Sequence, residues 1–161
     1  MKRNKFSLSN YKLGSFDMGT LYPLGFQEVV PGDTFQHSTS LLVRVLPLQS
    51  PVMHPIQVRV HHWFVPYRLI WDDFEDFITG GPDGNDASVH PVRSGTYNVG
   101  SLMDYLGCPT SVALIGVNAL PPRAYNLIYN EWYRDQDLVT EATIDTTSGT
   151  DTTTNLSLHQ I

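Results

Sequence analysis

Two long stretches of alternating side chains constrain this chain more than any other feature. One follows a Pro-Gly-Asp turn and covers residues 35–45, and the other follows a proline-containing turn and covers residues 56–64. Side chains along a β-strand point to opposite faces in turn, so both stretches are predicted strands. One face of the first holds Phe35, His37, Thr39, Leu41, Val43 and Val45; the second has Ile56, Val58, Val60, His62 and Phe64 on one face and Gln57, Arg59, His61 and Trp63 on the other.

Both stretches exceed the usual strand length of about 5–6 residues, which suits a large β-sandwich. A jelly roll takes about eight strands. The rest of the chain offers a weaker strand near residues 21–30 and one short buried strand or turn near Ala113. The expected fold is therefore mainly β, a large sandwich that is incomplete here. Either the C-terminal tail supplies strands that the pattern does not reveal, or the remaining strands belong to a longer protein.

Residues 120–136, LPPRAYNLIYNEWYRDQ, are predicted to form an amphipathic helix. Pro122 suits a first helical turn, where a missing N–H costs nothing. One stripe holds Tyr125, Ile128, Tyr129 and Trp132, and the opposite, polar side holds Asn126, Asn130, Glu131 and Arg134. Large rings with polar tips suit a core boundary or a contact with another chain. We expect Ile128 and Trp132 in the core and leave Tyr125 open.

A second helix is predicted across residues 70–79. There the apolar residues recur every three to four positions, whereas in the preceding stretch they recur every two. Its apolar stripe holds Ile70, Phe74, Phe77 and Ile78, and Gly80 and Gly81 end it. Four acids, Asp72, Asp73, Glu75 and Asp76, fill the remaining positions. They have two interpretations: a solvated helix face, or a carboxylate cluster for a divalent metal or acid-base chemistry.

Two shorter signals complete the reading of the chain. Ser101 and Asp104 have capping-box spacing, and Gly107 and Pro109 follow, which predicts a short capped helix. Residues 138–161 hold eight threonines and no aromatic residue, so they are too polar to form a core of their own. The expected organisation is one domain with a basic arm at 1–19, strands at 20–66, helical insertions at 67–137 and a Thr-rich loop at 138–161.

Composition restricts the function classes. The chain has 161 residues and a formal net charge of -6, so it does not coat nucleic acid through bulk charge. A single cysteine, Cys108, forms no internal disulfide, which favours a reducing compartment. A basic start without a following apolar run does not resemble a secretory signal, and no run of about 18 apolar residues predicts a membrane helix. We expect a soluble protein made in the cytoplasm.

No motif predicts a catalytic, metal or cofactor site. His61 and His62 are adjacent, so in a strand they point to opposite faces and cannot share one ion. The His-x-His spacing of metal-binding cupins is absent, as are the hydrolase, zinc-protease and phosphate-loop patterns. The expectation is a protein that is not an enzyme and carries no cofactor.

The N-terminal arm has an uneven charge. Lys2, Arg3, Lys5 and Lys12 fall in the first twelve residues, with no acid among them. The arm is either a mobile terminus or a segment that meets phosphates, because a few basic side chains give salt-sensitive binding that is independent of sequence. For the second interpretation the candidate contacts are Lys2, Arg3 and Lys5. No aromatic and basic alternation singles out residues for stacking on unpaired bases.

Three blocks resemble a known family. The segments LYPLGFQEVVPGDTFQ, HHWFVPYRLIWDDFEDFITGG and LPPRAYNLIYNEWYRDQ occur in the same order as in the major capsid proteins of microviruses, and are most similar to those of the gokushoviruses. The blocks span residues 21–137 and are long and chemically distinctive. The family's coat protein is much longer than this chain.

The resemblance implies a viral jelly roll with long loop insertions and no catalytic role. It implies many copies in a small icosahedral bacteriophage shell around single-stranded DNA, assembled in the host bacterial cytoplasm and found in the virion. It implies a small basic DNA-associated virion protein as a further partner, and no membrane. Under this interpretation Tyr125, Tyr129 and Trp132 are subunit-interface or core aromatics, and the Thr-rich loop begins a surface insertion.

Two other classes of protein stay open on the residues alone. A glycan-binding β-sandwich is suggested by eight tyrosines and three tryptophans on a strand-rich chain. An enzyme on a jelly-roll scaffold requires the histidines or the acids at 72–76 to converge on a metal. Neither alternative accounts for three family-like blocks in order.

Overall fold

The protein is described by a computed structural model that covers residues 4–153 and 156–161. Lys2 and Arg3, two of the three predicted nucleic-acid contacts, lie outside these residues. The chain separates into two units. One consists of the described residues up to Phe26 together with Val65–Ile161, and the other is Gln27–Phe64.

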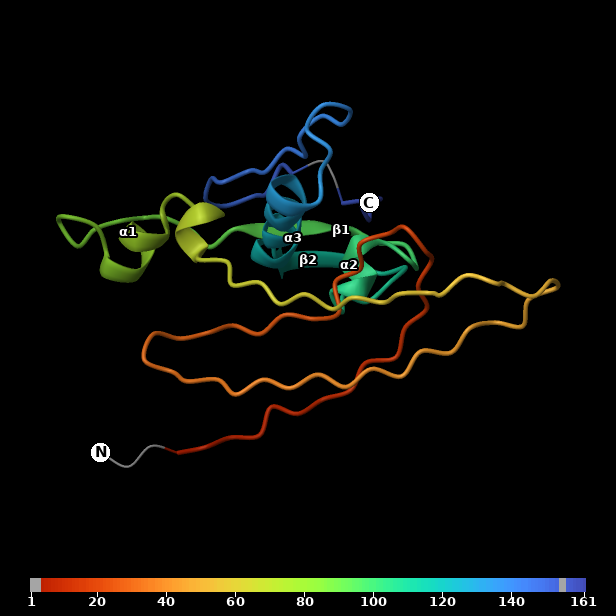
Figure 1. The fold of residues 1–161 in the computed structure, drawn as a ribbon. Coiled ribbons are helices and arrows are strands. Elements are labelled where there is room, and N and C mark those ends of the chain that lie inside the picture. The colour runs from red at the N-terminus through yellow and green to blue at the C-terminus, as the bar shows by residue number, and fades with distance from the viewer. Residues whose placement is uncertain (1–3, 154–155) are drawn as a thin grey trace. The chain divides into compact units, whose positions relative to one another are not determined.

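The helices and strands of the described residues all lie in the first unit (Figure 1). In chain order they are the 3₁₀ helix η1 (Tyr67–Leu69), α1 (Phe74–Thr79), β1 (Val92–Thr96), α2 (Leu102–Tyr105), β2 (Ala113–Asn118) and α3 (Leu120–Trp132). The sheet has two antiparallel strands, with Val92 opposite Asn118 and Thr96 opposite Ala113. Most of the described chain is neither helix nor strand.

The C-terminal tail lies along the free edge of β1. Val92 donates its N–H to the Gly149 carbonyl at 2.8 Å, and the Asp151 N–H returns a bond to the Val92 carbonyl at 2.9 Å. Val92 and Thr150 form an isolated parallel bridge. In Figure 1 the blue C-terminal segment accordingly runs beside β1 and α3. The Thr-rich residues thus continue the sheet through their backbone, although they bring no large apolar side chains.

The two predicted long strands are not hydrogen-bonded strands in this chain. No strand is assigned among residues 27–64, and their alternating side chains are largely exposed. A strand requires a partner for its ladder, whereas alternation reports only that one face is suited to burial. The two segments do meet at one point, because the His37 and His62 rings lie with their centroids 4.4 Å apart.

The helix predicted at residues 70–79 is shorter in the structure, where α1 covers only Phe74–Thr79. η1 and a turn occupy Tyr67 to Asp73, so α1 begins only at Phe74. Ile70 is therefore buried outside the helix, while Ile78 is 65% exposed. Gly80 ends α1 as expected, in the left-handed conformation with φ 84°, which costs glycine little.

The short capped helix is confirmed. The Ser101 hydroxyl accepts the Asp104 N–H at 3.4 Å, and the Asp104 carboxylate accepts the Gly100 N–H at 2.8 Å. Gly107 follows with φ 94°. The short strand predicted near Ala113 is also present as β2, but it is not buried, since Ile115 is 90% exposed.

The apolar core is small and lies beneath the start of α3. Ile70, Trp71 and Leu120 form its buried centre. Half-buried apolar side chains packed against them are Val65, Tyr67, Phe74, Ala124 and Leu127. Among the described residues, no helix has the length and apolar character needed to cross a membrane.

Candidate functional site: the buried polar face of α3 and the predicted contact residues

Part of the side of α3 predicted to face water is buried, although Glu131 on that side is exposed as expected. Asn126 is 0% exposed and Asn130 is 4% exposed, whereas Trp132, predicted to be in the core, is 66% exposed. Both predictions are wrong for one reason: the tail packs on the polar side of the helix and supplies hydrogen-bond partners there. Tyr125, left open by the sequence, is buried, as is Tyr129.

Asn130 binds the tail through its side-chain amide. Its Nδ2 donates to the Ala142 carbonyl at 2.8 Å, and its Oδ1 accepts the Ala142 N–H at 3.0 Å. The amide therefore satisfies both backbone polar groups of one residue, as a neighbouring strand would. This pairing lets a polar stretch of chain lie against a helix without leaving buried backbone groups unsatisfied.

Arg123 is the most buried charge of the site. It is 0% exposed, and its guanidinium contacts three separate parts of the chain. Nε donates to Asp151 Oδ1 at 2.8 Å, Nη1 to the Ile70 carbonyl at 3.0 Å, and Nη2 to the Thr147 carbonyl at 3.0 Å. One side chain thus ties the first turn of α3 to the end of η1 and to the tail.

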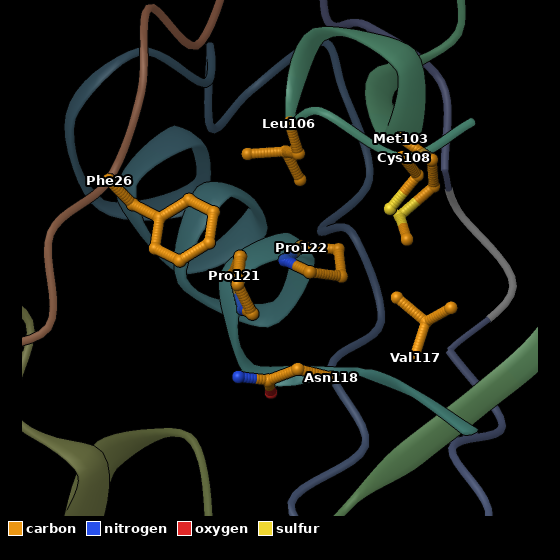
Figure 2. A pocket seen from close by; sticks show the side chains of 8 residues that line it. All are labelled: Phe26, Met103, Leu106, Cys108, Val117, Asn118, Pro121 and Pro122. Atoms are coloured by element: carbon orange, nitrogen blue, oxygen red, sulfur yellow. The ribbon is translucent and has the colours of Figure 1, made fainter. Parts of the chain in front are cut away.

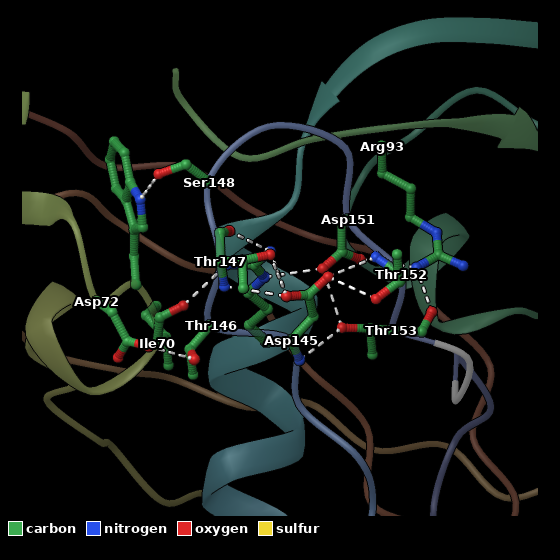
Figure 3. Close-up of polar contacts among 12 residues, drawn as sticks. Ile70, Asp72, Arg93, Asp145, Thr146, Thr147, Ser148, Asp151, Thr152 and Thr153 are labelled. Atoms are coloured by element: carbon green, nitrogen blue, oxygen red, sulfur yellow. Dashed lines mark hydrogen bonds and ion pairs between the residues drawn. The ribbon is translucent and has the colours of Figure 1, made fainter. Parts of the chain in front are cut away.

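Asp151 lies between Arg123 and Arg93, and Figure 3 shows its contact with Arg93. Its side chain is fully buried and contacts Arg123 on one oxygen and Arg93 Nη1, at 2.7 Å, on the other. Arg93 also donates to the Thr153 carbonyl, and the Thr153 hydroxyl donates to Asp151 at 2.9 Å. The buried carboxylate is therefore saturated with donors, which is the condition under which a buried ion pair is tolerated.

Asp145 organises the turn that carries these groups. It accepts the N–H and hydroxyl of Thr147 at 2.9 and 2.6 Å, and those of Thr152 at 2.7 and 2.6 Å (Figure 3). Burial alone raises the pKa of this carboxyl, but the four hydrogen bonds outweigh burial and hold its pKa well below the usual range. The threonine-rich composition thus serves a specific loop geometry.

The acids Asp72 and Asp73 have a role that neither interpretation of the sequence included. The Thr146 hydroxyl donates to Asp72 at 2.6 Å, and the Ser148 hydroxyl, itself bonded to the Trp71 indole N–H, donates to Asp73 at 2.7 Å. Both carboxylates therefore hold the tail. No group of three or more potential metal ligands is found in residues 4–153 and 156–161.

The C-terminus closes over the middle of α3. The His159 ring stacks on Tyr129 at 3.7 Å between centroids and on Tyr125 at 5.4 Å, and its Nε2 lies 3.0 Å from Asn126 Oδ1. The His159 N–H donates to the Tyr125 hydroxyl, which donates to the Leu21 carbonyl at 2.9 Å. Burial lowers the pKa of His159 and raises the pKa of Tyr125 to about 12.

Of the predicted arm contacts, only Lys5 lies within the described residues, where it is exposed. Lys12, the fourth basic residue of the arm, instead donates to the Tyr105 carbonyl and to the Pro23 carbonyl. Burial lowers the pKa of Lys12, and Asp104 partly opposes this effect. Lys12 therefore serves the fold of the first unit.

A small apolar pocket lies beside the N-terminus of α3 (Figure 2). Its lining is Phe26, Met103, Leu106, Cys108, Val117, Asn118, Pro121 and Pro122. Burial raises the pKa of the Cys108 thiol, which keeps it protonated and a poor nucleophile. Cys108 thus has the character of a structural thiol.

Comparison with known proteins assigns the family. The phage capsid protein (F protein) family matches residues 1–161. The chain belongs to this capsid protein family. The "Capsid protein VP1" of Chlamydia phage 1 is 43% identical over 149 residues, covering 86% of this chain and 25% of the relative. Those of Bdellovibrio phage phiMH2K and Spiroplasma virus 4 are 36% and 30% identical, covering 92% and 88% of this chain.

This chain spans between a quarter and three tenths of the length of these relatives. The family resemblance seen in the sequence is thereby confirmed, and the comparisons give no support to a glycan-binding module. The buried polar residues Arg123, Asn126, Asn130 and Asp151 were not found from the sequence. Arg123, Asn126 and Asn130 have the spacing of any solvated helix face, and Asp151 lies in the polar tail, so the pattern held no signal for them.

Proposed function

We propose that this chain is part of a coat protein that assembles into the shell of a small bacteriophage, the virion being its place of action. The observation that carries the proposal is the family match over all 161 residues, together with three relatives that are each named a capsid protein. A structural role needs no catalytic centre, and the polar clusters of the chain bind its own segments. The proposal therefore includes no enzymatic activity.

The proposed complete fold is a viral jelly roll in an icosahedral shell. The alternating stretches 35–45 and 56–64 support it, because each has an apolar face suited to a sandwich core. Faces of this kind are half exposed here: Phe35 is 44%, Leu41 47% and Ile56 46% exposed. Further strands of the coat protein are the proposed cover for these faces.

We propose Trp132 as a contact between coat subunits. It lies at the end of α3 and is 66% exposed, and Leu138 and Val139, a few residues later in the chain, are 83% and 44% exposed. Exposed tryptophan with neighbouring apolar side chains is typical of interface hot spots. Tyr125 and Tyr129, which were grouped with Trp132 in the sequence, are assigned to the subunit's own core because the C-terminus covers them.

The proposed cargo is single-stranded DNA, with Lys2, Arg3 and Lys5 of the basic arm meeting its phosphates. Each phosphate contact to a single strand contributes about 0.7 to the slope of log affinity against log salt. A small basic virion protein is proposed to share this neutralisation, and assembly is proposed to occur in the host bacterial cytoplasm. Replacing all three basic residues by Gln should lower the slope by about 2.

Sedimentation velocity on material that contains the whole coat protein tests the proposal, with absorbance recorded at two wavelengths to follow protein and nucleic acid together. The expected result is a megadalton-scale particle that carries DNA. A slow species free of nucleic acid under all assembly conditions would contradict the proposal. Trp132→Ala should reduce particle yield while leaving the unassembled subunit folded, which separates an interface role from a core role.

A further inference from the structure

The second unit, Gln27–Phe64, carries a surface that the proposed function does not yet use. Residues 34–71 contain no Asp or Glu, although the chain as a whole has sixteen. Within that stretch lie Arg44, Arg59 and Arg68 and four of the six histidines. The two acids of the unit, Glu28 and Asp33, both precede it. The two extended segments are therefore free of negative charge, which favours a polyanion as a partner.

The contact of His37 with His62 defines the two sides of this unit. Thr39 Oγ1 lies 2.8 Å from His37 Nε2 and 3.1 Å from His62 Nε2, so these three side chains are on one side. In residues 35–45 the alternating apolar side chains fall at odd positions, as His37 and Thr39 do. In residues 56–64 they fall at even positions, as His62 does. In the sequence alternation, Gln57, Arg59, His61 and Trp63 fall on the opposite face from His62.

The other side of the second segment brings together basic, planar and amide groups. Arg59 Nη2 donates to Gln57 Oε1 at 3.4 Å, and the His61 and Trp63 rings meet edge to face at 6.1 Å. These contacts join two pairs of residues two apart, Gln57 with Arg59 and His61 with Trp63, and the alternation of the sequence places all four on one face. All four are exposed, and Trp63 retains 38% of its surface accessible. We call residues Gln57, Arg59, His61 and Trp63 the 57–63 row.

Each member of this row matches one part of an unpaired nucleotide. A guanidinium binds phosphate oxygens, often in a bidentate manner. Indole and imidazole rings stack on bases, and the Gln amide bonds with base edges. Double-stranded nucleic acid hides its bases in the stack, so planar side chains on an open surface fit a single strand better.

We infer that the 57–63 row is a binding surface for single-stranded nucleic acid, with Arg59 on phosphate and Trp63 and His61 stacked on bases. The inference rests on the proposed coat function for its biological setting, and it adds a second contact surface to that of the N-terminal arm. The alternation of the sequence already placed these four residues on one face, and the structure adds that all four are exposed and in contact in pairs.

The test measures binding of the full chain to a fluorescein-labelled thirty-residue oligothymidylate by anisotropy across a salt series. Arg59→Gln should weaken binding at low salt and lower the slope of log affinity against log salt by about 0.7. Arg68→Gln is the matched control, since it removes the same charge from an exposed residue outside the row. It should leave affinity close to that of the parent chain. Equal losses for the two variants would overturn the inference, as would no binding by the parent.

Stacking is tested separately through the indole. DNA should quench the tryptophan fluorescence of the parent chain, and Trp63→Leu should reduce this quenching. Trp63→Tyr should retain binding because it keeps a stacking ring. Circular dichroism establishes that each variant is folded as the parent is. Unchanged affinity in Trp63→Leu would contradict the stacking role.

A particle-assembly experiment distinguishes failure of the 57–63 row from failure of the proposed coat function. Particles that form and package DNA equally well with Arg59→Gln, Trp63→Leu and the parent sequence would overturn the 57–63 row alone. Absence of any particle from the parent coat protein would overturn the coat function, whatever the anisotropy result.

Discussion

At the scale of single residues, the structure depends on a charge buried in the first turn of a helix. Arg123 has no exposed surface and makes hydrogen bonds to α3's neighbours on two sides, so its removal affects several segments together. A buried ion pair adds little net stability compared with a well-packed apolar replacement of both partners, but removing one partner leaves the other desolvated and unpaired.

Arg123→Met should therefore destabilise the first unit by about 3–5 kcal/mol, because Asp151 would lose one of its two arginines while remaining buried. The urea midpoint of unfolding, followed by circular dichroism, measures the loss. Arg68→Gln, at an exposed position, is the control and should change stability by less than about 0.5 kcal/mol. A midpoint for Arg123→Met equal to that of the parent would show that the network is dispensable.

The large aromatic side chains of α3 are either buried, as Tyr129 is, or exposed, as Trp132 is, and a pair of variants distinguishes the two. Tyr129→Ala removes a ring that is 4% exposed and stacked on His159, and should cost about 3–5 kcal/mol, as for other large buried rings. Trp132→Ala, at 66% exposed, should cost about 1 kcal/mol or less in the unassembled chain. Thermal unfolding compares the two, and the reverse order would restore the core position expected for Trp132 from the sequence.

At the scale of elements, the tail determines which side of α3 is dry. The helix itself follows its pattern, with Pro121 and Pro122 in the first turn. Its polar stripe is buried because Asn126, Asn130 and Arg123 each find a partner in residues 142–161. A solvated helix face and a face that binds a polar segment have the same residue pattern, so the sequence predicted the helix but not its orientation.

The C-terminal segment should loosen in acid. Burial lowers the pKa of His159 in the folded chain, so as pH falls through about 6.5 the unfolded chain takes up the proton first. Stability present above that pH is therefore lost below it. Melting temperature measured from pH 8 to pH 5 should fall in the parent and fall less in His159→Phe, which has no group to protonate. Parallel curves for the two would contradict the assignment.

The turn at residues 145–152 should fail at lower pH. The pKa of Asp145 is held down in the folded chain, so its contribution is complete above the unfolded value of about 3.9 and is lost as pH falls further. Asp145→Asn keeps one acceptor but cannot accept four hydrogen bonds from Thr147 and Thr152. Its unfolding midpoint should be lower than the parent's at pH 7, with the difference shrinking below pH 4. A constant difference across that range would argue against the hydrogen-bonded carboxylate.

At the scale of the whole molecule, a large apolar surface remains open. Exposed residues in the second unit include Leu42 at 88%, Leu46 at 83% and Phe64 at 77%, and Ile115 in the first unit is 90% exposed. Large apolar side chains left open to solvent in each unit favour burial against a partner. The coat assignment accounts for it if other parts of the coat protein, or neighbouring subunits, cover these side chains.

The chain on its own should consequently bind the dye ANS, and binding per chain should fall when the whole coat protein assembles. Fluorescence titration of both materials at equal chain concentration measures the difference. Ile115→Ser is a suitable variant, because it removes an exposed side chain with little effect on the fold and should reduce dye binding by the isolated chain. Equal dye binding before and after assembly would mean that these surfaces stay open in the particle.

The sequence by itself determined the family, a helix within residues 120–136, the capped turn at Ser101 and the absence of bulk positive charge, because each depends on local chemistry or on long distinctive blocks. It did not reveal β1, since VRSGT has no alternation strong enough to mark a strand. Only the tertiary structure decided that Asn126 and Asn130 are buried, that Trp132 is exposed, and that a Thr-rich tail fills a core position. The physical reason is that burial of a polar side chain depends on whether a distant segment arrives with matching donors and acceptors, and local pattern contains no record of that segment.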